Sequence, residues 1–263
     1  MGIIWGDGWA TSVEEADREA LASLASRITV SVFGEFRSVE EQWTTSSGTG
    51  YKSLRSSQLR TVTEATLRDT GRAVLRSGRR AHVGRWIRRS ELDAVFTARA
   101  RRVIDYFHSA GEAEEELRAG DALRYYYWAH ILLRSLPRPS ELRDEGGHML
   151  LNAIPERMNS ILGDIGVSAS KADGRLLLSF RFHGLPAQSL AFSCFDGAGW
   201  SPRTEVDEGR AEVELAQGAL GEIVQLRIEY EYRTEAMMDS ELAGLFSATD
   251  TRPMKKALII FRR

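Results

Sequence analysis

The sequence predicts an α+β protein with three successive parts: a small helix-on-antiparallel-sheet module, a helical hairpin and an immunoglobulin-like β-sandwich. Three observations support this order. Apolar residues recur at helical spacing near the N-terminus, and a second helical pattern follows residue 90. In the last part of the chain apolar and polar residues mostly alternate, with a period of two. We therefore expect domains at residues 1–89, 90–163 and 164–263.

Composition agrees with a folded, multi-domain chain. The 263 residues are 43% hydrophobic and 27% charged, which argues against global disorder, and 35 basic residues nearly balance 37 acidic ones. The single cysteine, Cys194, excludes an internal disulfide and a cysteine-rich metal site. No apolar stretch approaches the length of about 18 residues that a membrane span needs, and the first residues lack the pattern of a signal peptide.

The N-terminal module is predicted to begin with a strand followed by a helix. Residues 3–10 form a short apolar stretch in which Gly6 and Gly8 permit a bulge or a close backbone approach. Ser12 and Glu15 have the spacing of a capping box, so a helix should begin here. One apolar stripe follows at helical spacing: Ala16, Ala20, Leu21, Leu24, Ala25 and Ile28.

The rest of this module is predicted to be strands and a loop. From Ile28 to Val32 apolar and polar residues alternate, which is typical of a half-buried strand. Residues 44–57 are rich in Ser, Thr and Gly and indicate a long loop. Residues 73–75 and 81–87 are expected to pair as a hairpin around Ser77 and Gly78.

The middle part is predicted to be helical. Ser90 with Asp93 signals a helix start, and the acidic run 112–116 continues that helix on a solvated face. A break at Gly120 begins a second helix, which ends near Pro137 and makes the pair an αα-hairpin. Tyr, Tyr, Tyr and Trp at 125–128 point all round this helix, so we expect them to pack between lobes rather than to form an aromatic binding face. A further helix is expected over 149–162, kinked or begun at Pro155.

The C-terminal part is predicted to be a sandwich of five or six short strands without a disulfide. The expected strands are 176–182, 190–195, 211–215, 223–232 and 257–261, with a hairpin signal at Asp196-Gly197 and a short helix over 239–246.

No motif in the sequence indicates catalysis. Gly6-Asp7-Gly8 lacks the third glycine of a dinucleotide fingerprint, and the run 48–53 fails as a phosphate loop. The five histidines lack metal-ligand spacing, and Cys194 lies in a predicted strand without a nearby histidine, as a buried structural cysteine would. We expect no enzyme activity, no metal and no cofactor. A hydrolase assembled from distant segments is the alternative.

Arginines form the strongest local anomaly. Residues 68–102 contain eleven arginines and three acidic residues, a local net charge of +8, whereas residues 105–121 carry a net charge of −5. Guanidinium groups suit phosphates and carboxylates, so an anionic polymer such as a nucleic acid or an acidic glycan could bind here. The candidate residues are Arg76, Arg79, Arg80, Arg85, Arg88 and Arg89. The competing interpretation, which we favour, is an outer sheet face whose arginines pair with the nearby acidic helix.

The N-terminal residues also resemble a known family. Trp5-Gly6-Asp7-Gly8, the run SVEEAD at 12–17 and the pattern AL..LA..I.V at 20–30 are similar to the bacterial Lpp-twenty lipoprotein family over residues 3–89. The segment 89–135 is similar to an extension of longer members. The resemblance implies an outer-membrane lipoprotein that faces the periplasm or the cell surface and has no established catalytic residues.

The resemblance shapes the functional expectation. We expect a non-enzymatic cell-envelope binding or structural module whose partner is another envelope protein, with nucleic acid not expected. Contact with the membrane would come only through a lipid anchor. Because the chain has no N-terminal lipobox cysteine, that anchor would belong to residues trimmed from this mature domain. A cytoplasmic relative is the alternative.

Overall fold

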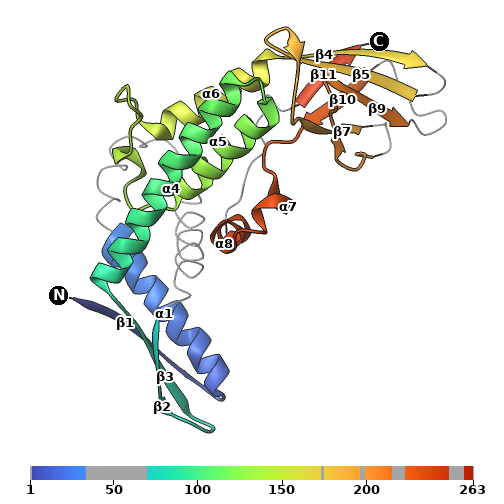
Figure 1. Ribbon diagram of the computed structural model, residues 1–263. Helices are drawn as coiled ribbons and strands as arrows, with labels where there is room; N and C mark the ends of the chain where they lie inside the picture. The colour runs from blue at the N-terminus through green and yellow to red at the C-terminus, as the bar shows by residue number, and fades with distance from the viewer. Residues whose placement is uncertain are drawn as a thin grey trace, which may run out of the picture. The chain divides into compact units, whose positions relative to one another are not determined.

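The computed structural model describes residues 2–33, 70–172, 175–195, 199–214, 223–248 and 258–262. Helices and antiparallel sheets alternate along them, which confirms the mixed α+β class (Figure 1). The chain divides into two compact units. The first comprises residues 1–101, 131–142 and 236–251, and the second comprises 102–130, 143–235 and 252–263. The expected three-domain division stays a prediction.

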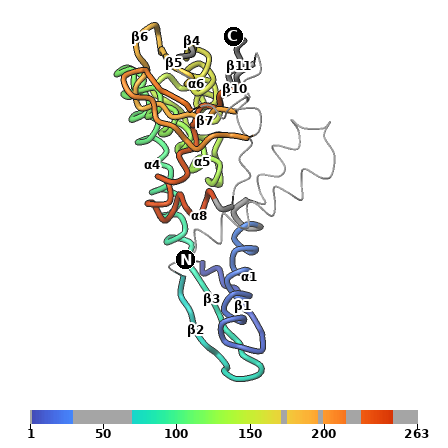
Figure 2. Tube along the Cα trace, turned by 90° about the vertical axis from the view of Figure 1, so that its right-hand side faces the viewer, coloured from blue at the N-terminus to red at the C-terminus, as the bar shows by residue number. Residues whose placement is uncertain are grey.

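A three-stranded antiparallel sheet with one helix opens the first unit. The sheet has the order β1-β3-β2, and the helix α1 lies along it, as both views show (Figure 2). The elements are β1 (Ile3–Ala10), α1 (Val13–Phe33), β2 (Gly71–Arg76) and β3 (Ala81–Arg88). The expected strand at 3–10 and the expected hairpin around Ser77 and Gly78 are therefore confirmed.

Small residues bring α1 onto this sheet. Strands β1 and β3 pair without interruption from Ile3 to Ala10, so the glycines of β1 do not serve a bulge. They serve close approach instead: a Cβ at Gly6 would lie 2.2 Å from the backbone N of Leu24, and one at Gly8 would lie 2.1 Å from the carbonyl O of Ala16. No side chain fits at either position.

The start of α1 follows the sequence prediction, but its end does not. The backbone N–H of Glu15 donates to the Ser12 hydroxyl over 3.2 Å, as a capping box requires. The expected strand from Ile28 to Val32 is wrong, because α1 continues to Phe33. Ile28 extends the buried helical stripe, and the Thr29 hydroxyl donates to the Ala25 carbonyl over 2.8 Å, so β-branched residues are accommodated within the helix.

Helices complete the first unit. They are the first part of α4 (Arg89–Glu115), the end of α5 (Ala119–Arg134), the short η2 (Pro139–Glu141) and α8 (Ser240–Ala248), which confirms the helix expected near 239–246. The buried guanidinium of Arg99 donates to Glu241 over 2.7 Å and to the Ser135 hydroxyl over 2.9 Å. Helix α4 begins one residue before the expected cap Ser90, with the Glu91 carboxylate accepting the N–H of Arg88.

The aromatic run of α5 packs within the second unit. Tyr127 contacts Tyr230 edge to face, and the indole N–H of Trp128 donates to the Glu231 carbonyl over 3.0 Å. Tyr126 is buried beside Glu114, and burial together with that carboxylate raises the pKa of its phenol. These contacts lie within one unit, so the run is packed inside the protein, whereas its expected packing between lobes stays a prediction. Helix α6 (Leu150–Asp164) runs through Pro155 without ending there.

Two four-stranded antiparallel sheets make up the rest of the second unit. One has the order β11-β10-β7-β8; in the other, β4 pairs one side of β5 while β6 and β9 pair its other side. The strands are β4 (Ile165–Ala172), β5 (Arg175–Phe182), β6 (Leu185–Pro186), β7 (Ala191–Phe195), β8 (Thr204–Glu205), β9 (Arg210–Glu214), β10 (Ile223–Ile228) and β11 (Leu258–Arg262). Phe180 of one sheet packs on Phe192 of the other, with ring centroids 4.9 Å apart.

One expected strand in this region is too long. The alternation over 223–232 predicts a strand to Tyr232, but β10 ends at Ile228 and the short helix α7 (Arg233–Ala236) follows. The Glu229 carboxylate accepts the N–H groups of Glu231 and Tyr232, and Tyr232 has a φ of +49°, so the chain turns there. The loop expected at 44–57 and the hairpin at Asp196-Gly197 lie outside the described residues. Among the helices that are described, none is long and apolar enough to cross a membrane.

Candidate functional site

The side of the three-stranded sheet that faces away from α1 carries large apolar side chains. Alternation along β1 directs Gly6 and Gly8 toward α1, so Trp5 and Trp9 point the other way. Trp5 is 52% exposed, Trp9 53% and Trp86 of β3 37%. We call this surface the tryptophan face and define it by Ile3, Trp5, Asp7, Trp9, Leu75, His82, Trp86 and Arg88.

Each of the three indole rings is backed by protein on one side. The Trp86 ring lies across Gly71, where a Cβ would stand 2.2 Å from its Cε2 atom. The Trp9 ring stacks on His82 with centroids 3.7 Å apart and 14° between the planes. The Arg27 guanidinium lies 4.0 Å from the Trp5 ring centroid. These contacts hold the rings in place while about half of the surface of Trp5 and of Trp9 stays open.

A carboxylate lies between the rings. Asp7 follows Trp5 by two residues and precedes Trp9 by two, and its oxygens lie 3.7 Å from Arg27 and 3.8 Å from His82. Both distances exceed that of a hydrogen bond, so the oxygens keep acceptor capacity. Beside this residue, along the edge of β1, lies a hollow of about 460 Å³. Its lining is mostly polar: Asp7, Glu19, Ala22, Ser23, Ser26 and Arg27.

The structure separates the six candidate arginines into two environments. Arg76, Arg79 and Arg80 are exposed at the β2–β3 hairpin, and Arg88 and Arg89 are exposed at the other end of β3. In the part of the chain that is described, no carboxylate pairs with the three hairpin arginines. Arg88 lies 3.6 Å from Glu91.

Arg85 instead lies on the α1 side of the sheet. It makes two hydrogen bonds to Asp17, of 2.7 and 2.8 Å, and Arg72 adds a third of 3.0 Å. The hydrogen bond from Arg85 is the main cause that lowers the pKa of Asp17, and the same pairing raises the pKa of Arg85.

The pairing expected between the arginines and the acidic helix is therefore wrong for Arg72 and Arg85, because their partner is Asp17 of α1. The acidic helix has other partners. Glu114 faces Arg157 at 3.6 Å, and Glu116 pairs with Arg118 at 2.8 Å. The competing interpretation of the arginine region therefore fails for Arg72 and Arg85, and among the described residues it finds no acidic partner for the exposed hairpin arginines either.

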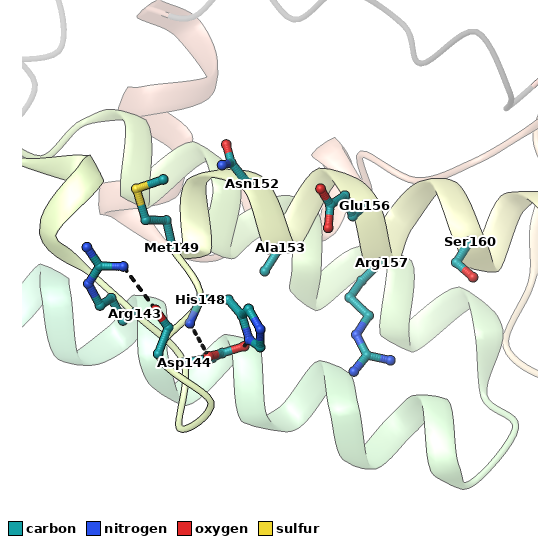
Figure 3. A pocket seen from close by; sticks show the side chains of 10 residues that line it. Arg143, Asp144, His148, Met149, Asn152, Ala153, Glu156, Arg157 and Ser160 are labelled. Atoms are coloured by element: carbon teal, nitrogen blue, oxygen red, sulfur yellow. Dashed lines mark hydrogen bonds and ion pairs between the residues drawn. The ribbon is translucent and has the colours of Figure 1, made fainter.

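A second hollow, of about 590 Å³, lies at the start of α6 in the second unit (Figure 3). Asp144 and His148 face one another there: the carboxylate accepts the backbone N–H of His148 at 2.8 Å and lies 3.1 Å from its ring Nδ1. The backbone hydrogen bond is the main cause that lowers the pKa of Asp144. Arg143 donates to the Gly147 carbonyl over 2.9 Å. These groups satisfy one another and fix the loop 143–148, and the other polar residues of the lining, Asn152, Glu156, Arg157 and Ser160, are spaced along α6.

We next consider the cysteine and the residues that could bind a metal ion. Cys194 is buried, as the sequence predicts, and its backbone N–H donates to the Ser201 hydroxyl over 3.0 Å. Among the described residues, no three His, Cys, Asp or Glu side chains are grouped so as to hold a metal ion.

The sequence contains a signal for the tryptophan face. Trp5 and Trp9 occupy alternate positions of β1, and Gly6 and Gly8 occupy the positions between them, so the tryptophans and the glycines lie on opposite sides of the strand. The sequence does not show which of the two sides is covered by α1 and therefore buried.

Comparisons with known proteins identify no relative of this chain. No family model matches it, and no curated protein and no solved structure does. The geometry of the tryptophan face and of the arginines around it is therefore the basis for a functional conclusion.

Proposed function

We propose that the chain is a non-enzymatic binding module that holds an anionic polymer on the tryptophan face. The observation that carries this proposal is the set of three exposed indole rings, each backed on one side, with exposed arginines at both ends of the same sheet. Soluble proteins rarely expose several large apolar side chains together unless the patch contacts another molecule. The surrounding charge indicates which kind of molecule it is.

Positive charge marks both ends of the tryptophan face. Arg76, Arg79 and Arg80 lie at the hairpin end next to Trp9 and His82, and Arg88 lies opposite Ile3 at the other end. Guanidinium groups bind carboxylates, sulfates and phosphates through paired N–H donors. A linear anion along the sheet would therefore meet arginines at each end and aromatic rings between them.

Titration with heparin, a sulfated glycan, tests this proposal. Replacing Arg76, Arg79 and Arg80 together by Ala should weaken binding about 3- to 150-fold, since each exposed ion pair contributes about 0.2–1 kcal/mol. The matched control removes the same charge from the second unit, through Ala at the exposed Arg175, Arg181 and Arg210. Binding should also weaken as salt rises, because polyanion contacts release counterions. Equal affinity of both triple variants would overturn the proposal.

A second proposal concerns the C-terminal sheets: residues 164–263 form an immunoglobulin-like domain that contacts a protein partner. The observation in its favour is the strand order. The strand order is β4-β5-β9 in one sheet and β11-β10-β7-β8 in the other. In immunoglobulin-like domains the corresponding strands, named by letters along the chain, have the orders A-B-E and G-F-C-C′.

The resemblance to the Lpp-twenty family supports a cell-envelope location for this module, with another envelope protein as the partner. Crosslinking in native membranes followed by fractionation of the full-length protein tests the location. Recovery with envelope proteins would support it. Recovery of all the protein in the cytosol, without lipid, would contradict it.

A further inference from the structure

We propose that the anionic polymer is an acidic glycan, whose sugar rings stack on Trp5, Trp9 and Trp86 and whose acid groups meet the arginines at the ends of the face. This inference rests on the proposed binding function and names the class of its ligand.

The shape of the tryptophan face suits a chain of stacked rings. Trp5 lies directly opposite Trp86 on the neighbouring strand, so the two side chains form one broad platform. Trp9 stands four residues further along β1, about 13 Å away, and forms a second platform with His82 behind it. Because Gly71 and His82 lie behind two of these rings, each presents a flat outer surface. Sugar rings, which carry apolar C–H groups on one side, pack on such surfaces.

The groups between the platforms suit hydroxyls. Asp7 lies midway, and its oxygens have no hydrogen bond shorter than 3.5 Å from Arg27 or His82. Ser23 and Ser26 belong to α1, not to the tryptophan face; they line the hollow that Asp7 also lines, and their hydroxyls can both donate and accept. A sugar offers several hydroxyl donors and acceptors per ring, so its polar edge can be satisfied here while its apolar side stacks.

The same carboxylate disfavours the two other anionic partners. A single-stranded nucleic acid carries one phosphate on every unit, and Asp7 would repel phosphates that pass along the middle of the face. An anionic lipid surface would need the rings to insert into an apolar layer, which would desolvate Asp7. A glycan with one acid group per sugar meets the same repulsion where it passes Asp7, but its hydroxyls can donate to the Asp7 oxygens, which a phosphodiester cannot do, and it leaves Asp7 in contact with solvent.

The experiment compares four probes by isothermal titration calorimetry of the whole chain. They are polygalacturonate fragments, which carry one carboxylate per sugar; neutral dextran of equal length; oligothymidylate; and phosphatidylglycerol vesicles. The variants are Trp5→Ala, Trp9→Ala and Trp86→Ala, with Trp200→Ala of the second unit as the matched control. Trp200 is an exposed tryptophan that also has an arginine, Arg227, 4.0 Å from its ring. Circular dichroism establishes that each variant is folded.

Polygalacturonate should bind, and each of the three tryptophan variants should weaken it about 3- to 10-fold, the effect of one aromatic contact. Trp200→Ala should stay within about twofold of the wild type, and neutral dextran should bind more weakly than polygalacturonate. Binding of oligothymidylate or vesicles in preference to the glycan would overturn the glycan assignment while leaving an anion-binding face intact. Absence of binding to all three anionic probes would overturn both proposals. Polygalacturonate binding that is equal in all variants would remove the tryptophans from the site.

Discussion

Two antiparallel β regions of this protein place their bulky side chains in opposite ways. In the C-terminal sheets, Leu176, Leu178, Phe180 and Phe182 of β5 are all buried, and the residues between them are exposed or half-buried. In the three-stranded sheet of the first unit, β1 turns its glycines inward and its tryptophans outward. The same two-residue alternation thus builds a core in one region and an apolar surface in the other.

The difference follows from what covers each sheet. The C-terminal sheets pack on one another through large rings such as Phe180 and Phe192, as in two-layer β folds generally. Helix α1 instead approaches so closely that Gly6 and Gly8 have no room for a Cβ. Apart from Ile4, which packs on the core beside α1, the large apolar side chains of β1 therefore lie on the outer side, where they are free to contact a ligand.

The largest effect should come from the C-terminal sheets. Phe180→Ala removes a fully buried ring and should lower the free energy of unfolding by about 4 kcal/mol, the usual cost of such a cavity. Urea denaturation followed by circular dichroism measures this loss. A loss below about 1 kcal/mol would show that the two sheets do not share this core.

Gly8→Ala should be nearly as damaging, because the added Cβ would lie 2.1 Å from the Ala16 carbonyl and force α1 off the sheet. We expect a loss of about 3 kcal/mol in the same measurement. Gly84→Ala is the matched control on β3, since there a Cβ would meet only a Leu75 methyl at 3.8 Å, and the change should be within about 0.5 kcal/mol. Equal losses in the two variants would contradict the packing described for α1.

Asp17→Asn should have a moderate effect. It removes the charge that holds Arg72 and Arg85 and should cost about 1 kcal/mol at neutral pH, since the pair is partly solvated. Because the folded-state pKa of Asp17 is lowered below its usual 3.8, its contribution is present above that pH and is lost as the pH falls through the folded value. The stability difference between wild type and variant should therefore shrink below pH 4. A difference that grows on acidification would contradict the assignment.

Trp5→Ala should have the smallest effect on stability, within about 1 kcal/mol, because half of this side chain is exposed. The contrast with Phe180→Ala is the sharpest test of the comparison between the two regions. A loss as large as that of Phe180→Ala would place Trp5 in a core and would remove the reason to regard its side of the sheet as a binding surface.

Local patterns in the sequence predicted much of this fold. The capping box at Ser12, the turn at Gly78 and the alternation in β5 depend on neighbouring residues, so they could be identified without the structure. The end of α1 could not, because Ile28 to Val32 fits both a strand and a helix, and contacts with Leu24 and Ile87 select the helix.

The site depends on contacts between distant segments, which sequence spacing does not reveal. The bond from Arg85 to Asp17 joins residues 68 positions apart and separates Arg85 from the exposed arginines. Strand β4 (Ile165–Ala172) was not identified as a separate strand, because its residues are mostly small or polar and the eight-residue pairing with β5 defines it. The tryptophan face likewise depends on α1 lying against the opposite side of the sheet, which the spacing of residues in β1 does not specify.

The most direct test of the central claim is an NMR titration that follows the indole N–H signals of the tryptophans as polygalacturonate fragments are added. Single Trp→Phe variants assign the signals. The signals of Trp5, Trp9 and Trp86 should shift or broaden together, whereas those of Trp128, buried against Glu231, and Trp200, in the second unit, should stay unchanged. Shifts confined to Trp200, or no shift in Trp5, Trp9 and Trp86 while the glycan binds, would contradict the account.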